Sequence, residues 1–448
     1  MTALPRLTRL LLAVSASFAA PWLGAQEPQP PVPAPAPAPT PAPVPAPVPV
    51  PDPTPPPAAA TQEPQGGERP GPGGARGPRR RGQGGPEQEL TELPEFTPVA
   101  APPLSGLQGK QSFWFTMYPD FVVQFDPVTD TVTKQIELKH GLFWSTQLTH
   151  DRQRLLVVTG QQQTIEVVDL ATGTVAAEHE FHEDGFVLRI RQIRECPGGV
   201  HWLVQTDRVK KEVDRYSFEP PLWLLYDSAN HKVVRKARRL PEALDRARLA
   251  ADGTQWLAQD KDGNLTFLDA RTCREVGRIA LDTPRFFGAG TLRLTGTDLL
   301  DRRDPNRALM VFTSTDPVES RRTTWGTVEL DLANKTIGAV QEWGPSQNTW
   351  GLRVAYKKRI VAAMGGGFGR DDSKTRLLLY DLTTGRKLVE REHELRPRRS
   401  LVAISPEADK VYIGTAGSDF EVFDDQLQRL KTVELPGEIV GTIHVVDG

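Results

Sequence analysis

The chain has 448 residues, and its 54 lysines and arginines nearly balance its 56 aspartates and glutamates, for a formal net charge of −2. This balance excludes proteins that bind nucleic acid through a large excess of basic residues, so we expect no nucleic-acid partner. Only two cysteines are present, Cys196 and Cys273, too few for a disulfide framework or a cysteine-rich zinc site. The sequence leaves open whether these two cysteines pair.

Residues 1–25 have the pattern of a signal peptide. Arg6 and Arg9 form a basic start, Leu10 to Ala20 form an apolar core, and Leu23 to Ala25 form a small-residue cleavage site. The apolar core is too short to span a bilayer, so no transmembrane segment is expected. This pattern predicts export to the periplasm, the cell surface or the medium; an uncleaved membrane anchor is the alternative.

Residues 26–104 form a linker that is not expected to fold. Residues 28–60 alternate proline with alanine and valine, a composition typical of a stiff polyproline II spacer. Residues 64–89 are rich in glycine and arginine and have too little apolar surface to fold. We therefore predict a disordered, proline-rich tether ahead of a globular part at 105–448.

A short phrase recurs through that globular part: an apolar run, an aspartate, two or three turn residues and a second alternating run. Its clearest copies are IEVVDLATGTVAAEHEF and LLLYDLTTGRKLVEREHEL. The repeated aspartates are Asp126, Asp169, Asp227, Asp269, Asp331, Asp381 and Asp424. Their separations of 43, 58, 42, 62, 50 and 43 residues indicate a unit of about 42 residues, a period typical of propeller blades built from short strands.

Each unit contains four predicted strands, so the fold class is all-β and the architecture a seven-bladed β-propeller. Each aspartate is expected to start an Asx-turn and to have a structural role. Four residues after the aspartate, some units have glycine or aspartate, which suits a left-handed backbone position. In units with another residue at that position, Asn230 or Asn334 is expected to shift the turn. The final run from Glu438 has no partner in its own unit, so we expect it to close the ring on the first blade.

VVDLATGTV, LLYDLTTGRKL and VYIGTAGSDFEVFD resemble the YVTN-type repeat propellers, within the broad class of WD40-like and quinoprotein amine dehydrogenase β-chain-like folds. The resemblance covers about residues 105–448. It implies a propeller and says little about activity, because this class includes binding and scaffold proteins, dehydrogenase subunits and haem-d1-related proteins.

The resemblance implies two cofactors that could bind in the central channel, pyrroloquinoline quinone and haem. This chain has no motif that matches either. Quinone-binding blades end in Gly-Lys-x-x-Trp, whereas this chain has Gly173-Thr-Val-Ala-Ala and Gly385-Arg-Lys-Leu-Val. Haem would need a histidine facing the channel, for which His150 and His444 are the candidates. No cofactor and no metal are expected. The predicted inner strands also carry Arg191, Arg248, Arg293 and Arg353, which would bind an anion or ordered water if they faced inward.

Insertions between the second and third strands mark a second candidate site. They lie at 207–221, 314–325 and 364–374, in the third, fifth and sixth blades, and so rise on one face of the ring. Their basic and aromatic residues suit an acidic protein surface or an anionic ligand. The candidate binding residues are Arg208, Lys210, Lys211, Arg215, Tyr216, Arg321, Arg322, Trp325, Phe368 and Arg370. The alternative is a set of solvated hairpin tips whose acidic residues cancel the charge.

The sequence thus favours an exported, monomeric, non-catalytic propeller on a stiff tether that binds a protein or an anionic ligand such as an anionic polymer. The alternative is a periplasmic oxidoreductase or hydrolase that uses the central channel. No catalytic residue is assigned.

Overall fold

The computed structural model describes residues 89–101, 111–141, 145–241, 244, 247–260, 262–295, 306–345, 350–366, 374–394, 401–414 and 417–447. The chain divides into Met1–Pro78 and Arg79–Gly448, and only the second unit contains described residues. The expectations for the signal peptide at 1–25 and for the tract at 26–88 therefore remain predictions. Two candidate site residues, Phe368 and Arg370, also lie outside the described residues.

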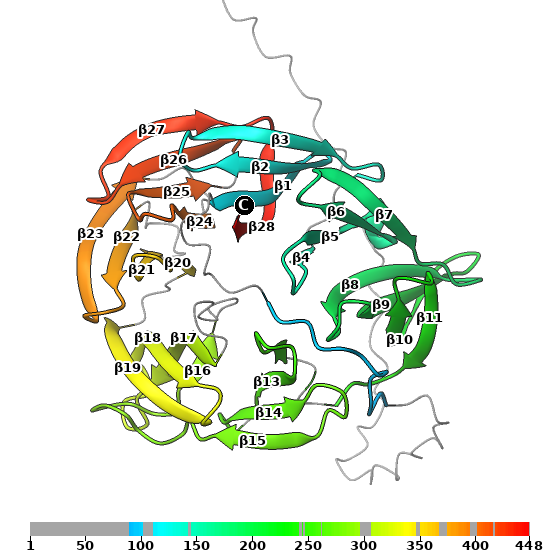
Figure 1. The fold of residues 1–448 in the computed structure, drawn as a ribbon, viewed down its shortest axis with the longest axis horizontal. Helices are drawn as coiled ribbons and strands as arrows, with labels where there is room; N and C mark the ends of the chain where they lie inside the picture. Colours follow the sequence, from blue (N-terminus) through cyan, green and yellow to red (C-terminus); the bar gives the residue numbers. More distant parts are fainter. Residues whose placement is uncertain are drawn as a thin grey trace, which may run out of the picture. The chain divides into compact units, whose positions relative to one another are not determined.

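Seven four-stranded antiparallel sheets surround a central channel (Figure 1), as the repeat predicts. From the channel outward, blades one to three are β28 (Glu438–Asp447), β1 (Gln111–Tyr118), β2 (Phe121–Asp126), β3 (Thr131–Glu137); β4 (Thr146–Leu148), β5 (Arg154–Thr159), β6 (Thr164–Asp169), β7 (Thr174–Glu180); and β8 (Val187–Glu195), β9 (His201–Lys211), β10 (Tyr216–Asp227), β11 (Lys232–Ala237). Blades four and five are β12 (Arg248–Leu249), β13 (Gln255–Gln259), β14 (Leu265–Asp269), β15 (Glu275–Ile279); and β16 (Arg293–Thr295), β17 (Arg307–Thr315), β18 (Thr323–Asp331), β19 (Thr336–Pro345). Blades six and seven are β20 (Trp350–Ala355), β21 (Ile360–Gly366), β22 (Lys374–Asp381), β23 (Arg386–Glu394); and β24 (Leu401–Ile404), β25 (Lys410–Gly414), β26 (Asp419–Asp424), β27 (Arg429–Glu434).

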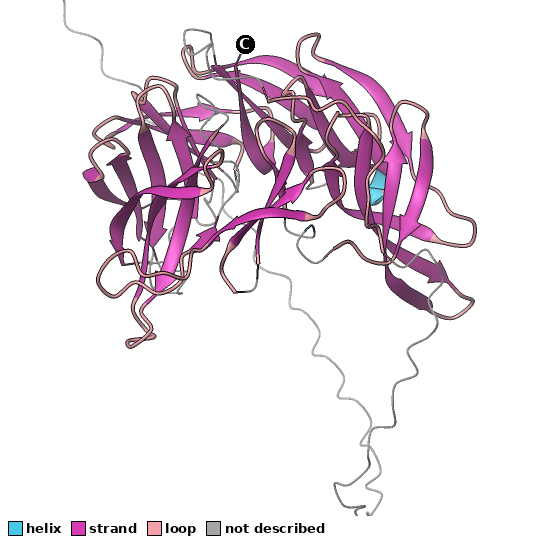
Figure 2. Ribbon diagram, turned by 60° about the horizontal axis from the view of Figure 1, so that its bottom comes forward, coloured by secondary structure: helices cyan, strands magenta, loops and turns pink. Residues whose placement is uncertain are grey.

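Strand and loop make up nearly all of the described chain, with one short 3-10 turn, η2 (Gly160–Gln162) (Figure 2). Within the described ranges, no helix is long and apolar enough to cross a membrane.

Burial along the strands follows from the way the blades stack. Both faces of a middle strand pack against neighbouring blades, so β5 and β6 are buried along nearly their whole length. Outer strands reach solvent and alternate, as in β3. The hydrophobic core consists of seven clusters of described residues, one between each pair of adjacent sheets. The core is therefore a ring that leaves the axis open.

The seven repeated aspartates start the turns between the third and fourth strands, as predicted. Asp169 Oδ1, for example, accepts the Thr172 backbone N–H at 2.8 Å, and the other six accept N–H groups of their own turns in the same way. The left-handed position is occupied by Asp130, Gly173, His231, Cys273, Lys335, Gly385 and Leu427. The expectation that Asn230 or Asn334 would shift the turn is wrong, because His231 and Lys335 adopt positive φ themselves, at 50° and 53°.

Strand β28 closes the ring as expected. It pairs antiparallel with β1, from Gln111 opposite Asp447 to Tyr118 opposite Glu438. Its Ile439 and Ile443 join the cluster between the seventh and first blades. The first blade is therefore built from both ends of the globular part.

Residues 89–101, which the sequence analysis placed in the linker, pack on the third and fourth blades. Leu90 and Leu93 are 1% and 3% exposed in the cluster between these blades. The Ala101 N–H donates to Ala251 O at 2.7 Å. Gly253, at φ 73°, lies beneath Val99, whose carbonyl oxygen would be 2.5 Å from an added Cβ. We call residues 89–101 the strap; it crosses the ring towards the channel (Figure 1).

Candidate functional site in the central channel

A cavity of about 1050 Å³ occupies the axis of the ring. All seven innermost strands contribute to its lining, including Thr442 and His444 from β28 and Ile404 from β24. The cavity is large enough for a drug-sized or cofactor-sized ligand. It forms because the inter-blade clusters fill the space between sheets and leave the channel to the inner strands.

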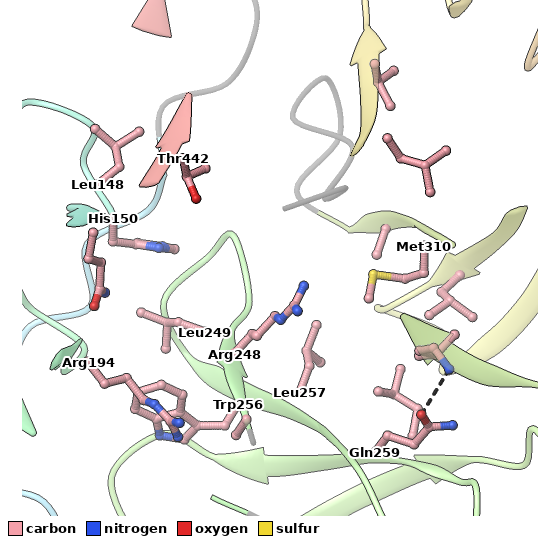
Figure 3. Close-up of a pocket in the computed structure, with 18 of the residues that line it drawn as sticks. Leu148, His150, Arg194, Arg248, Leu249, Trp256, Leu257, Gln259, Met310 and Thr442 are labelled. Carbon is pink, nitrogen blue, oxygen red and sulfur yellow. Dashed lines mark hydrogen bonds between the residues drawn. The ribbon is translucent and has the colours of Figure 1, made fainter. Parts of the chain in front are cut away.

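Three arginines from consecutive blades line this cavity: Arg248 on β12, Arg293 on β16 and Arg353 on β20. Figure 3 shows Arg248 extending from its strand towards the middle of the cavity. Arg353 Nη1 donates to Leu352 O at 2.8 Å, which holds the guanidinium beside its own strand. A set of permanently charged, fork-shaped donors is suited to carboxylate, sulfate or phosphate.

The fourth inner arginine named from the sequence, Arg191, does not line the cavity. A bulge in β8 between Ile190 and Gln192 shifts the alternation of the strand at Arg191. The Arg191 side chain then forms an ion pair with Asp207, with Nε and Oδ2 2.5 Å apart. Arg194 lines the cavity instead, stacks on the Trp223 ring at 5.8 Å and donates to Leu244 O. The repeat alone gave no sign of the bulge.

Apolar side chains cover much of the remaining wall. They are Leu148, Ile193, Leu249, Leu257, Leu294, Met310, Leu352, Val354, Ile404 and Ile443. A ligand that fills the cavity would therefore contact hydrocarbon and polar side chains in similar measure, with guanidinium groups among the polar contacts.

Both candidate histidines line the cavity, as the sequence suggested, and each Nε2 has a hydrogen-bond partner. His150 Nε2 lies 3.2 Å from Ala251 O and must donate to it. His444 Nε2 lies 3.0 Å from Thr146 Oγ1. Burial lowers the pKa of His150 below its ordinary value, so this ring is neutral near pH 7. No group of three or more His, Cys, Asp or Glu side chains is placed to hold a metal among the described residues.

Three acids in the cavity wall were not predicted from the sequence, Glu195, Asp260 and Asp262, and Glu195 is the buried one. It is 6% exposed, and its Oε2 accepts the His150 backbone N–H at 2.5 Å. Burial raises the pKa of Glu195 to about 7. Its only sequence signal is an acid at the end of an inner strand, which says nothing about depth.

We expect Glu195→Gln to stabilise the protein above pH 7. The folded state holds the Glu195 proton up to about pH 7, whereas an unperturbed glutamate loses it near 4.5. The stability that this group contributes is therefore full below pH 4.5 and is lost as pH rises through 7, at a cost of roughly 3 kcal/mol. Thermal melts should show a higher Tm for the variant at pH 8 and little difference at pH 4.5. An equal gain at both pH values would contradict this account.

The rim residues named from the sequence have different environments. Arg208 forms a two-point ion pair with Glu183, at 2.8 and 2.9 Å, and stacks over Phe186, so it has a structural role. Trp325 is only 3% exposed, because it packs between the fifth and sixth blades against Trp343 and Tyr380. Neither side chain is available at a rim.

The remaining described rim residues are exposed. Lys210, Lys211, Arg215 and Tyr216 lie on the third-blade hairpin, and Arg321 and Arg322 lie in the turn before β18 of the fifth blade. The intervening fourth blade separates the two groups, so the structure does not join them into one patch.

The two cysteines are both free, with Cys196 buried and Cys273 half-buried. Burial raises the pKa of each thiol, which makes both unreactive packing residues. The question of pairing that the sequence left open is thus answered.

No protein-family model and no curated protein matches this sequence. Similar solved structures include a protein of unknown function from Desulfotomaculum acetoxidans, 15% identical, with a TM-score of 0.45 over 75% of this chain and 99% of that chain. Dihydro-heme d1 dehydrogenase NirN in complex with DHE is 13% identical, with a TM-score of 0.44 over 80% of this chain and 78% of that chain. BamB from Moraxella catarrhalis is 15% identical, with a TM-score of 0.36 over 78% and 93%. The seven sheets around one channel make this chain a seven-bladed β-propeller.

Proposed function

We propose that this protein is an exported, non-catalytic binding module whose central channel holds an anionic ligand with an apolar body. The observation that carries the proposal is that Arg248, Arg293 and Arg353 line one cavity whose wall also has a large apolar part. Export rests on the signal-peptide pattern of residues 1–25.

The charge balance of the cavity supports an anion over a cation. Arg194 adds a fourth guanidinium to the wall, against Glu195, Asp260 and Asp262. Burial keeps Glu195 partly protonated at neutral pH. The Asp260 carboxylate is occupied by its own turn, where it accepts from the Asn264 N–H at 2.9 Å and the Asn264 side chain at 3.1 Å. The wall therefore carries four guanidinium groups and three carboxyl groups, one of which is partly protonated at neutral pH.

The proposal is tested with two aromatic probes of similar size that differ in charge: anionic 8-anilinonaphthalene-1-sulfonate and uncharged N-phenyl-1-naphthylamine. Arg248→Gln should weaken binding of the anion 10- to 100-fold, because a charge-assisted contact contributes about 1.5–3 kcal/mol. The uncharged probe should bind both proteins alike. Fluorescence titration of the purified protein measures both affinities.

Arg191→Gln is the matched control, since it removes the same charge outside the cavity. It should leave the affinity for the anion unchanged. Equal losses for both probes would mean that the variants damage the cavity itself, and unchanged binding of the anion would refute the proposal. A visible absorption band in protein purified from its native host would favour the oxidoreductase alternative instead.

A further inference from the structure

The third blade differs from the other blades with long hairpins in one respect: its outermost strand is short. In the fifth blade, β19 accompanies β18 along its length, from Asp331 opposite Thr336 to Thr324 opposite Pro345. In the sixth blade, β23 likewise pairs with β22 as far as Lys374. In the third blade, β11 stops at Ala237 opposite Trp223, while β10 continues back to Tyr216. Within the part of the chain that the structure describes, residues 216–219 of β10 therefore have no strand on their outer side.

The hydrogen-bond pattern of the β9–β10 hairpin shows which backbone groups this edge presents. The Glu212 N–H donates to Arg215 O at 2.8 Å, so this pair is of the hydrogen-bonded kind. Opposed pairs alternate along an antiparallel ladder. The pairs Tyr216–Lys211 and Phe218–Val209 are then non-hydrogen-bonded, and the N–H and C=O groups of Tyr216 and Phe218 point outward. Pro220 and Pro221 end the row of donors.

The side chains beside this open edge are also unusual for a protein surface. Tyr216 is 61% exposed and Phe218 is 75% exposed, two residues apart on the same face of β10. Val213 at the hairpin tip is fully exposed. Clustered exposed aromatic and aliphatic side chains on a protruding element mark interaction surfaces.

Basic residues outnumber acidic ones beside the place that a further strand would occupy, where the acids are Glu212, Asp214 and Glu219. Glu212 pairs with Arg215, and Lys236 pairs with Glu183. The stretch from Lys232 to Arg239 contains five basic residues and no acid: Lys232, Arg235, Lys236, Arg238 and Arg239. Of these, Arg238 and Arg239 directly follow the end of β11 and are exposed. Lys210 and Lys211 lie across the hairpin. The outer strands β3, β7, β15, β19, β23 and β27 all include glutamate, so this blade stands apart.

We propose that the third blade binds an extended acidic segment of a partner protein, which adds as a strand to the edge of β10 at Tyr216–Glu219. Main-chain hydrogen bonds to Tyr216 and Phe218 would supply the pairing, as in other cases of strand addition. The exposed aromatic rings would cover the apolar side chains of the segment, and the neighbouring lysines and arginines would meet its carboxylates. This surface is separate from the channel and does not depend on the proposed function.

The test uses a fluorescently labelled, end-blocked peptide, Thr-Glu-Val-Glu-Val-Glu-Val-Thr, and two variants at one position. Tyr216→Ala removes the ring, and Tyr216→Pro removes the ring together with the outward N–H. Proline is tolerated on an edge strand where the N–H faces outward. In anisotropy titrations, Tyr216→Ala should weaken binding two- to threefold, and Tyr216→Pro at least tenfold. Hydrogen exchange at the Phe218 amide should slow when the peptide binds.

Three controls make the result decisive. The same peptide with alternate N-methyl groups should lose binding; if it binds as well as the unmodified peptide, the contact is purely electrostatic and strand addition is wrong. Equal affinities for Tyr216→Ala and Tyr216→Pro, with matching Tm values, would also refute it, as would sedimentation showing that this edge pairs with a second copy of the chain. Arg248→Gln should bind the peptide like the wild type, which separates this proposal from the channel.

Discussion

Deleting residues 438–448 is expected to abolish the soluble folded protein. The deletion removes the buried residues Ile439, Ile443 and Val446, which are 4%, 3% and 7% exposed, and loss of each large apolar side chain costs about 2–5 kcal/mol. It also leaves the β1 edge unpaired along Phe113 and Trp114. The sum reaches the whole stability of a typical domain, about 5–15 kcal/mol. Expression followed by size-exclusion chromatography and thermal melting checks this outcome.

Two single substitutions on the same strand give a matched comparison. Ile443→Asn places a polar side chain in the cluster between the seventh and first blades and should lower Tm strongly. Thr442→Asn changes an exposed side chain that faces the channel and should leave Tm almost unchanged. If the protein that lacks residues 438–448 stays monomeric and melts cooperatively, ring closure by β28 is dispensable.

The architecture could be predicted because each blade repeats the same short sequence pattern. Asp169 and Asp381, for example, each start a turn after a run of β-forming residues, and seven such turns fix the number of blades. The pairing of β28 with the first blade could be predicted in the same way, because the first blade has no clear inner strand of its own in the sequence. Predictions of this kind need only short-range preferences and the requirement that sheet edges be covered.

The channel could be predicted only in part, because the orientation of an inner strand depends on its register. Arg248, Arg293 and Arg353 line the cavity as the sequence suggested, whereas the bulge at Arg191 turns that side chain away. Glu195 could not be recognised, because its burial depends on blades that are distant in sequence. The strap was assigned to the linker because Leu90 and Leu93 are isolated apolar residues in a polar stretch.

The junction between the seventh and first blades contains a buried ionic cluster around Asp130. This carboxylate is 2.9 Å from Lys410 Nζ and 2.8 Å from Lys431 Nζ, and it accepts the Tyr412 hydroxyl at 2.6 Å. Burial by itself would raise the pKa of Asp130, but hydrogen bonds from Lys431, Tyr412 and Lys410 hold it below its ordinary value of 3.8. Asp130 also occupies the left-handed turn position at φ 58°, which asparagine tolerates.

Asp130→Asn should therefore destabilise the protein by about 3–5 kcal/mol at neutral pH, because it leaves two lysines beside a buried amide with no change in side-chain size or backbone strain. Asp424→Asn is the matched control: this aspartate accepts the Gln426 and Gln428 N–H groups of its own turn, and an amide oxygen accepts them too. It should cost less than about 1 kcal/mol.

Because the folded-state pKa of Asp130 is lowered, its stabilisation is present above pH 3.8 and is lost as pH falls further. Denaturant unfolding at pH 7 and pH 3 should show the difference between wild type and Asp130→Asn shrinking in acid; a difference that is small at pH 7 would mean that apolar packing alone holds the ring closed.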